Sequence, residues 1–289
     1  MFLRIGLFLL TNFAIMLVFF AIINIFNIEQ YTGNGSMMSL LFTALFFGFS
    51  GSILSLLMSK WSAKKIMNVH IIEKDNYSNS DEKWLYETVE KLASKVNIKT
   101  PEVGIYEGEA NAFATGPSKN NSLVAVSTGL YEKMTYEEIE AVLAHEIGHV
   151  SNGDMVTQTL LQGVLNTFVI FLARIIGGAI DKKLFNNENG NGIGYMIISF
   201  VLEIVFSILA SLIIMWFSRY REYRADEMGA KLSGKNNMIN ALKRLGNIET
   251  EPLPEKMVSM GIAGGNIAKL FSTHPTIDKR IENIQNNIK

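Results

Sequence analysis

The stretch AVLAHEIGHVSNGD, residues 141–154, contains the pattern H-E-x-x-H at His145, Glu146 and His149. On a helix this pattern is the signature of a zinc protease, with Glu146 in the position of the general base. Residues four positions apart share one helical face, so both imidazoles can reach a single ion. We therefore predict that His145 and His149 bind a metal and that Glu146 is catalytic.

The residues before the pattern predict that it lies on a helix. Thr135-Tyr-Glu-Glu138 fits a capping box, in which the Thr135 hydroxyl accepts a hydrogen bond from the first turn and Glu138 reaches back to Thr135. Apolar residues then recur at helical spacing, at Ile139, Val142, Leu143 and Ile147. We expect one helix to begin near Thr135 and to carry both histidines.

Two histidines do not complete a catalytic zinc site, which usually has three protein ligands and a water. The 289-residue chain has no cysteine and four histidines in all, so the third ligand is a carboxylate or another histidine. His70 lies in an apolar stretch, where a histidine at the edge of a strand is the simpler interpretation. The third histidine of metzincin proteases is absent, because His149 is followed by Val-Ser-Asn-Gly-Asp.

A carboxylate-bearing segment follows the last apolar run of the chain. In the sequence SRYREYRADEMGA, residues 218–230, Glu222 and Asp226 lie four positions apart and so on one helical face. Glu222 can bind the metal while Asp226 accepts a hydrogen bond from the far nitrogen of a ligand histidine. The alternative is an exposed helix with ion pairs among its own side chains, and the spacing alone leaves both interpretations open.

Two apolar runs near the N-terminus predict a membrane anchor. The runs at 5–28 and 37–58 contain no Asp, Glu, Lys or Arg, and each is long enough to cross about 30 Å of hydrocarbon as a helix. Arg4 precedes the first run, Lys60 and Lys64 follow the second, and the connection between the runs has no Lys or Arg. Because cations favour the cytoplasmic side, we expect the N-terminus and the polar part of the chain to be cytoplasmic.

Two later apolar runs, at 156–180 and 193–217, contain the charged residues Arg174 and Glu203. A charge in hydrocarbon is costly, so both side chains should face protein or water. If the runs form a hairpin, the two charges lie in the half nearest its connection and can pair. The alternative is that this hairpin lies partly outside the lipid and packs on the soluble domain.

The remaining chain predicts a small α+β domain. Residues 81–96 have apolar positions at helical spacing, and three short β-leaning segments follow at 102–106, 111–115 and 122–127. We therefore expect a mostly helical domain with a small β-sheet, anchored by about four transmembrane helices in two hairpins. The expected order is an N-terminal hairpin, a first catalytic part, a second hairpin and a second catalytic part, at 1–60, 61–155, 156–217 and 218–289.

The order of these features resembles that of the HtpX-type membrane zinc metalloproteases, which are related to the CAAX prenyl endopeptidases. The resemblance covers nearly the whole chain and includes the four apolar runs and the H-E-x-x-H helix. Three further motifs carry it: Asn-Ala-Phe-Ala-Thr-Gly at 111–116, Arg-Glu-Tyr-Arg-Ala-Asp at 221–226 and Phe-Ser-Thr-His-Pro at 271–275.

The resemblance implies a zincin-like (gluzincin) fold, one Zn²⁺ per subunit and Glu222 as the third zinc ligand. It implies a multi-pass zinc endopeptidase of a bacterial-type plasma membrane, with a cytoplasmic catalytic domain. A zinc-bound water attacks the peptide bond in such enzymes, and Glu146 takes its proton as general base. Membrane proteins are the implied substrates, and quality control of membrane proteins is the implied role.

Two further residues are candidates for the site. His274 is our candidate donor to the oxyanion that forms at the cleaved carbonyl. Capping of the helix that Pro275 opens is an equal alternative for His274. Asn111, by the resemblance, lies on an edge strand that lines the cleft, where substrate can add as a β-strand. Its alternative role is support of a turn.

The rival function is a zinc-stabilised, non-proteolytic membrane scaffold. Glu146 argues against it, because a structural zinc site normally closes all four positions with protein ligands and has no use for a base. The net charge of −1 argues against nucleic acid as a partner and leaves the lipid bilayer and membrane proteins. The sequence specifies no oligomeric state.

Overall fold

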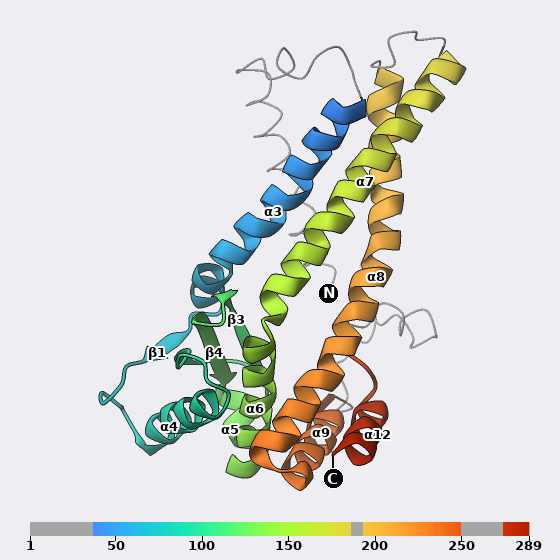
Figure 1. Ribbon diagram of the computed structural model, residues 1–289. Helices are drawn as coiled ribbons and strands as arrows, with labels where there is room; N and C mark the ends of the chain where they lie inside the picture. Colours follow the sequence, from blue (N-terminus) through green and yellow to red (C-terminus); the bar gives the residue numbers. More distant parts are fainter. Residues whose placement is uncertain (1–36, 186–192, 250–273, 289) are drawn as a thin grey trace, which may run out of the picture. The chain divides into compact units, whose positions relative to one another are not determined.

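The structure is a computed structural model that describes residues 37–185, 193–249 and 274–288 (Figure 1). The predicted helix at 5–28 lies outside the described residues, as do residues 186–192 of the second hairpin and 271–273 of the Phe-Ser-Thr-His-Pro motif. The described chain is mostly helical with one small sheet, so the predicted fold class is confirmed. Its elements are α3 (Met37–Ile66), β1 (His70–Ile72), α4 (Ser80–Lys95), β2 (Glu102–Tyr106), β3 (Ala112–Ser118), β4 (Asn121–Ser127), α5 (Thr128–Lys133), α6 (Tyr136–Asn152), α7 (Asp154–Phe185), α8 (Ile193–Ser233), α9 (Lys235–Glu249) and α12 (Ile277–Asn287).

The chain divides into two compact units. The first contains the described residues up to Ser55 together with Thr159–Ile214, and the second contains Leu56–Gln158 and the described residues from Met215 onward. The limits of the units fall inside α3, α7 and α8, which are continuous helices without linkers. The four-part division expected from the sequence stays a prediction.

The first unit is built from apolar helices. Within the described residues, three helical segments are long and apolar enough to cross a membrane, namely Ser39–Ile66, Asp154–Phe185 and Ile193–Ser233. Large apolar side chains remain exposed along them, such as Phe42 at 62% and Phe200 at 53%, which suits contact with lipid. The helices predicted for the second, third and fourth apolar runs are therefore confirmed.

Small residues allow α3 and α7 to approach closely in this unit. A Cβ added to Gly48 would lie 2.6 Å from the backbone nitrogen of Thr167 and 2.9 Å from the carbonyl oxygen of Gly163. Close contacts of this kind are a usual way for apolar helices to associate in lipid. Asn166 adds polar contacts, since its Nδ2 lies 3.5 Å from both the Gly48 carbonyl and the Ser52 hydroxyl.

Arg174 of α7 and Glu203 of α8 form the ion pair that the sequence predicted. Nε of Arg174 lies 3.3 Å from Oε1 of Glu203. The guanidinium also lies 5.8 Å from the centre of the Tyr195 ring, a cation–π distance. Pairing offsets part of the cost of placing two charges in apolar segments.

The second unit contains a mixed four-stranded sheet of order β1-β2-β4-β3. β1 is antiparallel to β2, β2 is parallel to β4, and β3 is antiparallel to β4. The three predicted β-leaning segments are thus confirmed as strands. His70 begins the edge strand β1, which confirms its interpretation as a strand-edge histidine, and β3 forms the opposite edge.

The helix α6 begins as the sequence predicted. Thr135 is its N-cap, and the capping box is complete: the Glu138 N–H donates to the Thr135 hydroxyl, and the Thr135 N–H donates to the Glu138 carboxylate at 3.0 Å. The helix ends at Asn152, and Gly153 follows in the left-handed conformation at φ 71°. Glycine suits this position because it has no Cβ.

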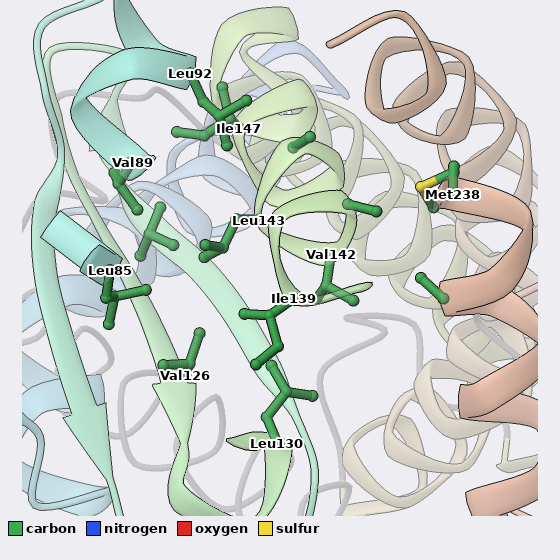
Figure 2. Packing of buried hydrophobic residues seen from close by; sticks show 14 of the residues in the cluster. Leu85, Val89, Leu92, Val126, Leu130, Ile139, Val142, Leu143, Ile147 and Met238 are labelled. Atoms are coloured by element: carbon green, nitrogen blue, oxygen red, sulfur yellow. The ribbon is translucent and has the colours of Figure 1, made fainter. Parts of the chain in front are cut away.

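The core of the second unit surrounds α6 (Figure 2). Ile139, Leu143 and Ile147 of α6 are each at most 1% exposed. Figure 2 shows them beside α4 and β4, with Met238 of α9 on the other side of the helix. Full burial of one such side chain contributes about 1.5–3 kcal/mol to folding. The helix that carries H-E-x-x-H is therefore held from several directions.

Candidate metal centre

Two helices supply the residues predicted for the metal site. α6 carries His145, Glu146 and His149, and α8 carries Glu222 and Asp226. α8 is one continuous helix, so the fourth apolar run and the Glu-x-x-x-Asp segment belong to the same element. The helical spacing assumed for Glu222 and Asp226 is thereby observed.

Gly148 lets α6 and α8 come close enough for their side chains to meet. A Cβ at this position would lie 3.3 Å from both Cα and the carbonyl oxygen of Ala225, and 3.2 Å from Cβ of Met228. Two of these three atoms are backbone, so they cannot move aside as a flexible side chain does. The glycine in H-E-I-G-H thus has a packing role.

The structure brings His145, His149 and Glu222 together. The two Nε2 atoms are 3.1 Å apart. Nε2 of His149 lies 3.2 Å from Oε1 of Glu222, and Nε2 of His145 lies 3.5 Å from Oε2. Ligands at about 2.0–2.1 Å from a tetrahedral Zn²⁺ are separated by about 3.3 Å. The two imidazole nitrogens and the two Glu222 oxygens therefore lie within the range of separations that suits ligands of a single ion of this type.

Carboxylates behind the two histidines orient their rings. Oδ1 of Asp226 lies 2.9 Å from Nδ1 of His145, and Oδ2 of Asp154 lies 2.6 Å from Nδ1 of His149. Each Nδ1–H donates to its carboxylate, which leaves the lone pair of each Nε2 directed at the other donors. The two nitrogen lone pairs and the Glu222 carboxylate all present negative charge to the same point, so they repel one another unless a cation lies between them. The donor set consequently fits a divalent metal ion.

The electrostatics of the site favour positive charge. Burial lowers the pKa of His149, but hydrogen bonds to Asp154 and Glu222 outweigh burial and raise this pKa to about 10. The pKa of His145 is also raised, because the contacts with Asp226 and Glu222 outweigh its burial. A site that stabilises extra protons in this way stabilises a metal cation for the same reason.

Asp154 is a site residue that the sequence analysis missed. It begins α7 directly after the left-handed Gly153, and this turn points its carboxylate back at His149. The sequence did contain a signal for Asp154, because a carboxylate follows directly after the glycine that ends the H-E-x-x-H helix. Arg221 supports the turn, because it donates to the Asp154 carbonyl at 2.9 Å and to the Gln158 side chain at 2.6 Å.

Arg280 is the second residue that was missed. It lies on α12 and is only 7% exposed. Its guanidinium donates to both oxygens of Asp226, at 2.8 and 2.6 Å. No local pattern indicated it, because Arg280 follows Asp226 by 54 positions in the chain.

Three other residues were predicted for the site, namely Glu146, His274 and Asn111. Glu146 is half-buried on α6, between the two histidines in sequence. Nδ1 of His274 lies 2.7 Å from Oε2 of Glu222, so His274 belongs to the cluster although its side chain is 59% exposed. Asn111 is exposed and directly precedes β3, and its backbone N–H and C=O form hydrogen bonds with Ser127.

The fold and the donor cluster define a zincin-type metallopeptidase with membrane-length helices. The chain belongs to peptidase family M48, whose family model matches residues 79–288. It is 53% identical over 288 residues to Protease HtpX of Pseudoalteromonas atlantica, a match that covers 98% of this chain and 99% of that protein. It is equally similar to a Protease HtpX homolog of Paracidovorax citrulli, at 53% over 289 residues and 98% of both chains.

A solved structure shares the fold. The crystal structure of S. mikatae Ste24p aligns with a TM-score of 0.62 at 20% identity and covers 93% of this chain and 67% of that one. The resemblance to HtpX-type proteases is thereby confirmed. The chain is a metallopeptidase, and its apolar helices make it an integral membrane protein.

Proposed function

We propose that this metallopeptidase is a zinc endopeptidase that cleaves membrane proteins at the cytoplasmic face. His145, His149 and Glu222 hold the ion in this proposal, and Glu146 is the general base. One observation carries it: the Nε2 atoms of His145 and His149 lie 3.1 Å apart and 3.5 and 3.2 Å from the two oxygens of Glu222, and a carboxylate lies behind each histidine. Two imidazoles and one glutamate form the donor set of known catalytic zinc sites, whereas Mg²⁺ and Ca²⁺ prefer oxygen ligands.

The remaining residues of the site have separate chemical tasks. A bound Zn²⁺ supplies Lewis acidity, which lowers the pKa of a water and polarises the scissile carbonyl. Glu146 accepts the proton of the attacking water and passes it to the leaving amine. His274, beside the Glu222 carboxylate, is the proposed donor to the developing oxyanion.

The substrate is proposed to bind along β3. This strand is an edge of the sheet and pairs with β4 on one side. An edge strand offers unpaired N–H and C=O groups, to which an extended peptide can add with little demand on its sequence. Asn111 directly precedes this strand and is assigned to the same surface.

The chain distances between the site and the apolar runs support membrane proteins as substrates. Asp154 opens α7, and Glu222 lies on α8 about one helical turn beyond the apolar run that ends at residue 217. Both belong to helices that contain membrane-length segments. Lys60 and Lys64 follow the apolar run at 37–58, and these cations favour a cytoplasmic location of the site. Removal of damaged membrane proteins is the cellular role that we propose.

The test compares the wild type with Glu146→Gln and Glu222→Ala after purification in detergent with a chelator. Zinc is restored, and cleavage of an unfolded membrane protein is followed together with bound zinc. We expect zinc-dependent cleavage by the wild type, zinc binding without cleavage by Glu146→Gln, and loss of zinc by Glu222→Ala. Cleavage by Glu146→Gln at the wild-type rate would contradict the mechanism. Zinc binding without any cleavage by the wild type would instead favour a non-proteolytic scaffold.

A further inference from the structure

Arg280 is a buried cation beside the metal centre that no step of the proposed reaction uses. Its Nε donates to Oδ2 of Asp226 at 2.8 Å, and its Nη2 donates to Oδ1 at 2.6 Å. Two parallel hydrogen bonds of this kind fix both the position and the plane of a carboxylate. Asp226 itself is 0% exposed, so its carboxylate is shielded from bulk solvent.

Asp226 transmits this orientation to a ligand. The same Oδ1 that accepts from Arg280 lies 2.9 Å from Nδ1 of His145. If Asp226 rotates, the His145 ring loses the hydrogen bond that directs Nε2 at the metal. Nη2 of Arg280 also lies 3.6 Å from Oε2 of Glu222, so the same cation stands next to two of the three donor residues.

The two ligand histidines are held by different parts of the chain. His149 is held by Asp154, five positions later, and Arg221 fixes the backbone of that turn. His145 is held by Asp226 and, behind it, by Arg280, which is 135 positions away from His145 on the C-terminal helix α12. Of the two histidines, His145 therefore depends on α12 through Asp226, whereas the carboxylate behind His149 comes from α7.

We propose that Arg280 is a positioning residue that sets the metal affinity through Asp226 and His145. The metal centre is then complete only when α12 is docked against α9 with its side chains reaching α8, and metal binding in turn stabilises that docking. This inference rests on the proposed metal site at His145, His149 and Glu222. It adds to that site a dependence on the last helix of the described chain.

Other contacts of α12 separate positioning from docking. Nδ2 of Asn283 donates to Oε1 of Glu227 at 3.1 Å, which joins α12 to α8 without involving Asp226. Ile284 is 0% exposed and anchors α12 in the core. Asn283→Ala is consequently a matched control, because it removes a polar contact between the same two helices and leaves the carboxylate behind His145 intact.

The experiment measures the zinc affinity of the full chain in detergent by competition with a chromogenic chelator. We expect Arg280→Met to weaken zinc binding about tenfold or more, the lower end of the effect of lost ligand-supporting contacts. Arg280→Lys keeps the charge without the paired donors and should recover part of the affinity. Asn283→Ala should bind as the wild type does. In an Asp226→Asn background, Arg280→Met should change the affinity less than about twofold, because the residue through which it acts is already altered.

A second readout follows hydrogen exchange of the α12 amides with and without zinc. Zinc should increase their protection in the wild type and in Asn283→Ala, but not in Arg280→Met. If Arg280→Met leaves α12 undocked altogether, the zinc affinity of Arg280→Lys is compared with that of the wild type instead, because this variant retains the buried charge. Wild-type affinity in Arg280→Met, or an equal loss with and without Asp226→Asn, would overturn the positioning role. Absence of zinc binding by the wild type, or binding that survives His149→Ala, would instead overturn the proposed metal site.

Discussion

Oδ2 of Asp154 lies 2.6 Å from Nδ1 of His149, although the two residues stand on different helices. The left-handed Gly153 is the single residue between α6 and α7 and makes this contact possible. The segment that contains H-E-x-x-H therefore also supplies the carboxylate that orients its second histidine. The first histidine has no such local partner among the described residues and relies on Asp226.

We predict that Asp154→Asn weakens zinc binding about 10–100-fold without unfolding the chain. An asparagine can still accept a hydrogen bond from His149, but it lacks the negative charge that makes the imidazole a better ligand. Chelator competition at constant pH measures the change. Glu137 is an exposed carboxylate in the first turn of α6, the helix that carries His149. The control variant Glu137→Gln should leave the zinc affinity unchanged. An affinity of Asp154→Asn within twofold of the wild type would contradict the role assigned to this contact.

We predict opposite effects for two glycines near the site. Gly148→Ala should lower stability by about 1–3 kcal/mol, because its Cβ meets the backbone of Ala225 at 3.3 Å. At Gly229 the nearest atom is the flexible Sδ of Met238, at 2.8 Å, so Gly229→Ala should be neutral or gain up to about 1 kcal/mol from helix propensity. Apparent Tm values in detergent compare the two variants. Equal Tm values would show that α6 and α8 are not packed as closely as described.

We predict that Arg174 and Glu203 stabilise the first unit only as a pair. Each single change, Arg174→Leu or Glu203→Leu, leaves one charge uncompensated in an apolar segment and should cost about 3–5 kcal/mol. The double variant removes both charges and should recover most of the loss. Resistance to unfolding in a denaturing detergent measures all three variants. A double variant as unstable as the two single variants combined would mean that the side chains, 3.3 Å apart here, do not interact in the membrane.

Local patterns predicted the parts of the structure that short chain segments determine. The Thr135–Glu138 capping box placed the start of α6 correctly, because its hydrogen bonds join residues three positions apart. His145 and His149 share a helical face for the same reason. The β-leaning segments appeared as strands, since each is short and separated from the next by residues that favour turns.

The missed features depend on contacts between distant segments. The parallel pairing of β2 with β4 places β4 between β2 and β3, an order that no segment contains by itself. By sequence Arg280 is an ordinary basic residue of an amphipathic helix, and its contact with Asp226 of α8 exists only when α12 is docked in the fold. Asp154 was close in sequence, but its direction depends on the backbone angle of Gly153, which a residue pattern does not specify.

We predict that zinc raises the apparent Tm of the chain, and that this shift distinguishes the metal ligands from the general base. A ligand that binds only the folded state at 1,000 times its Kd stabilises that state by about 4 kcal/mol, so chelation should lower the apparent Tm by on the order of 10 °C. His149→Ala removes a donor and should show no zinc-dependent shift. Glu146→Gln should keep the whole shift, because Glu146 is assigned to the water and not to the ion. If Glu146→Gln loses the shift while Glu222→Ala keeps it, the two glutamates have exchanged roles, and the donor set read from the 3.2 Å contact between His149 and Glu222 is wrong.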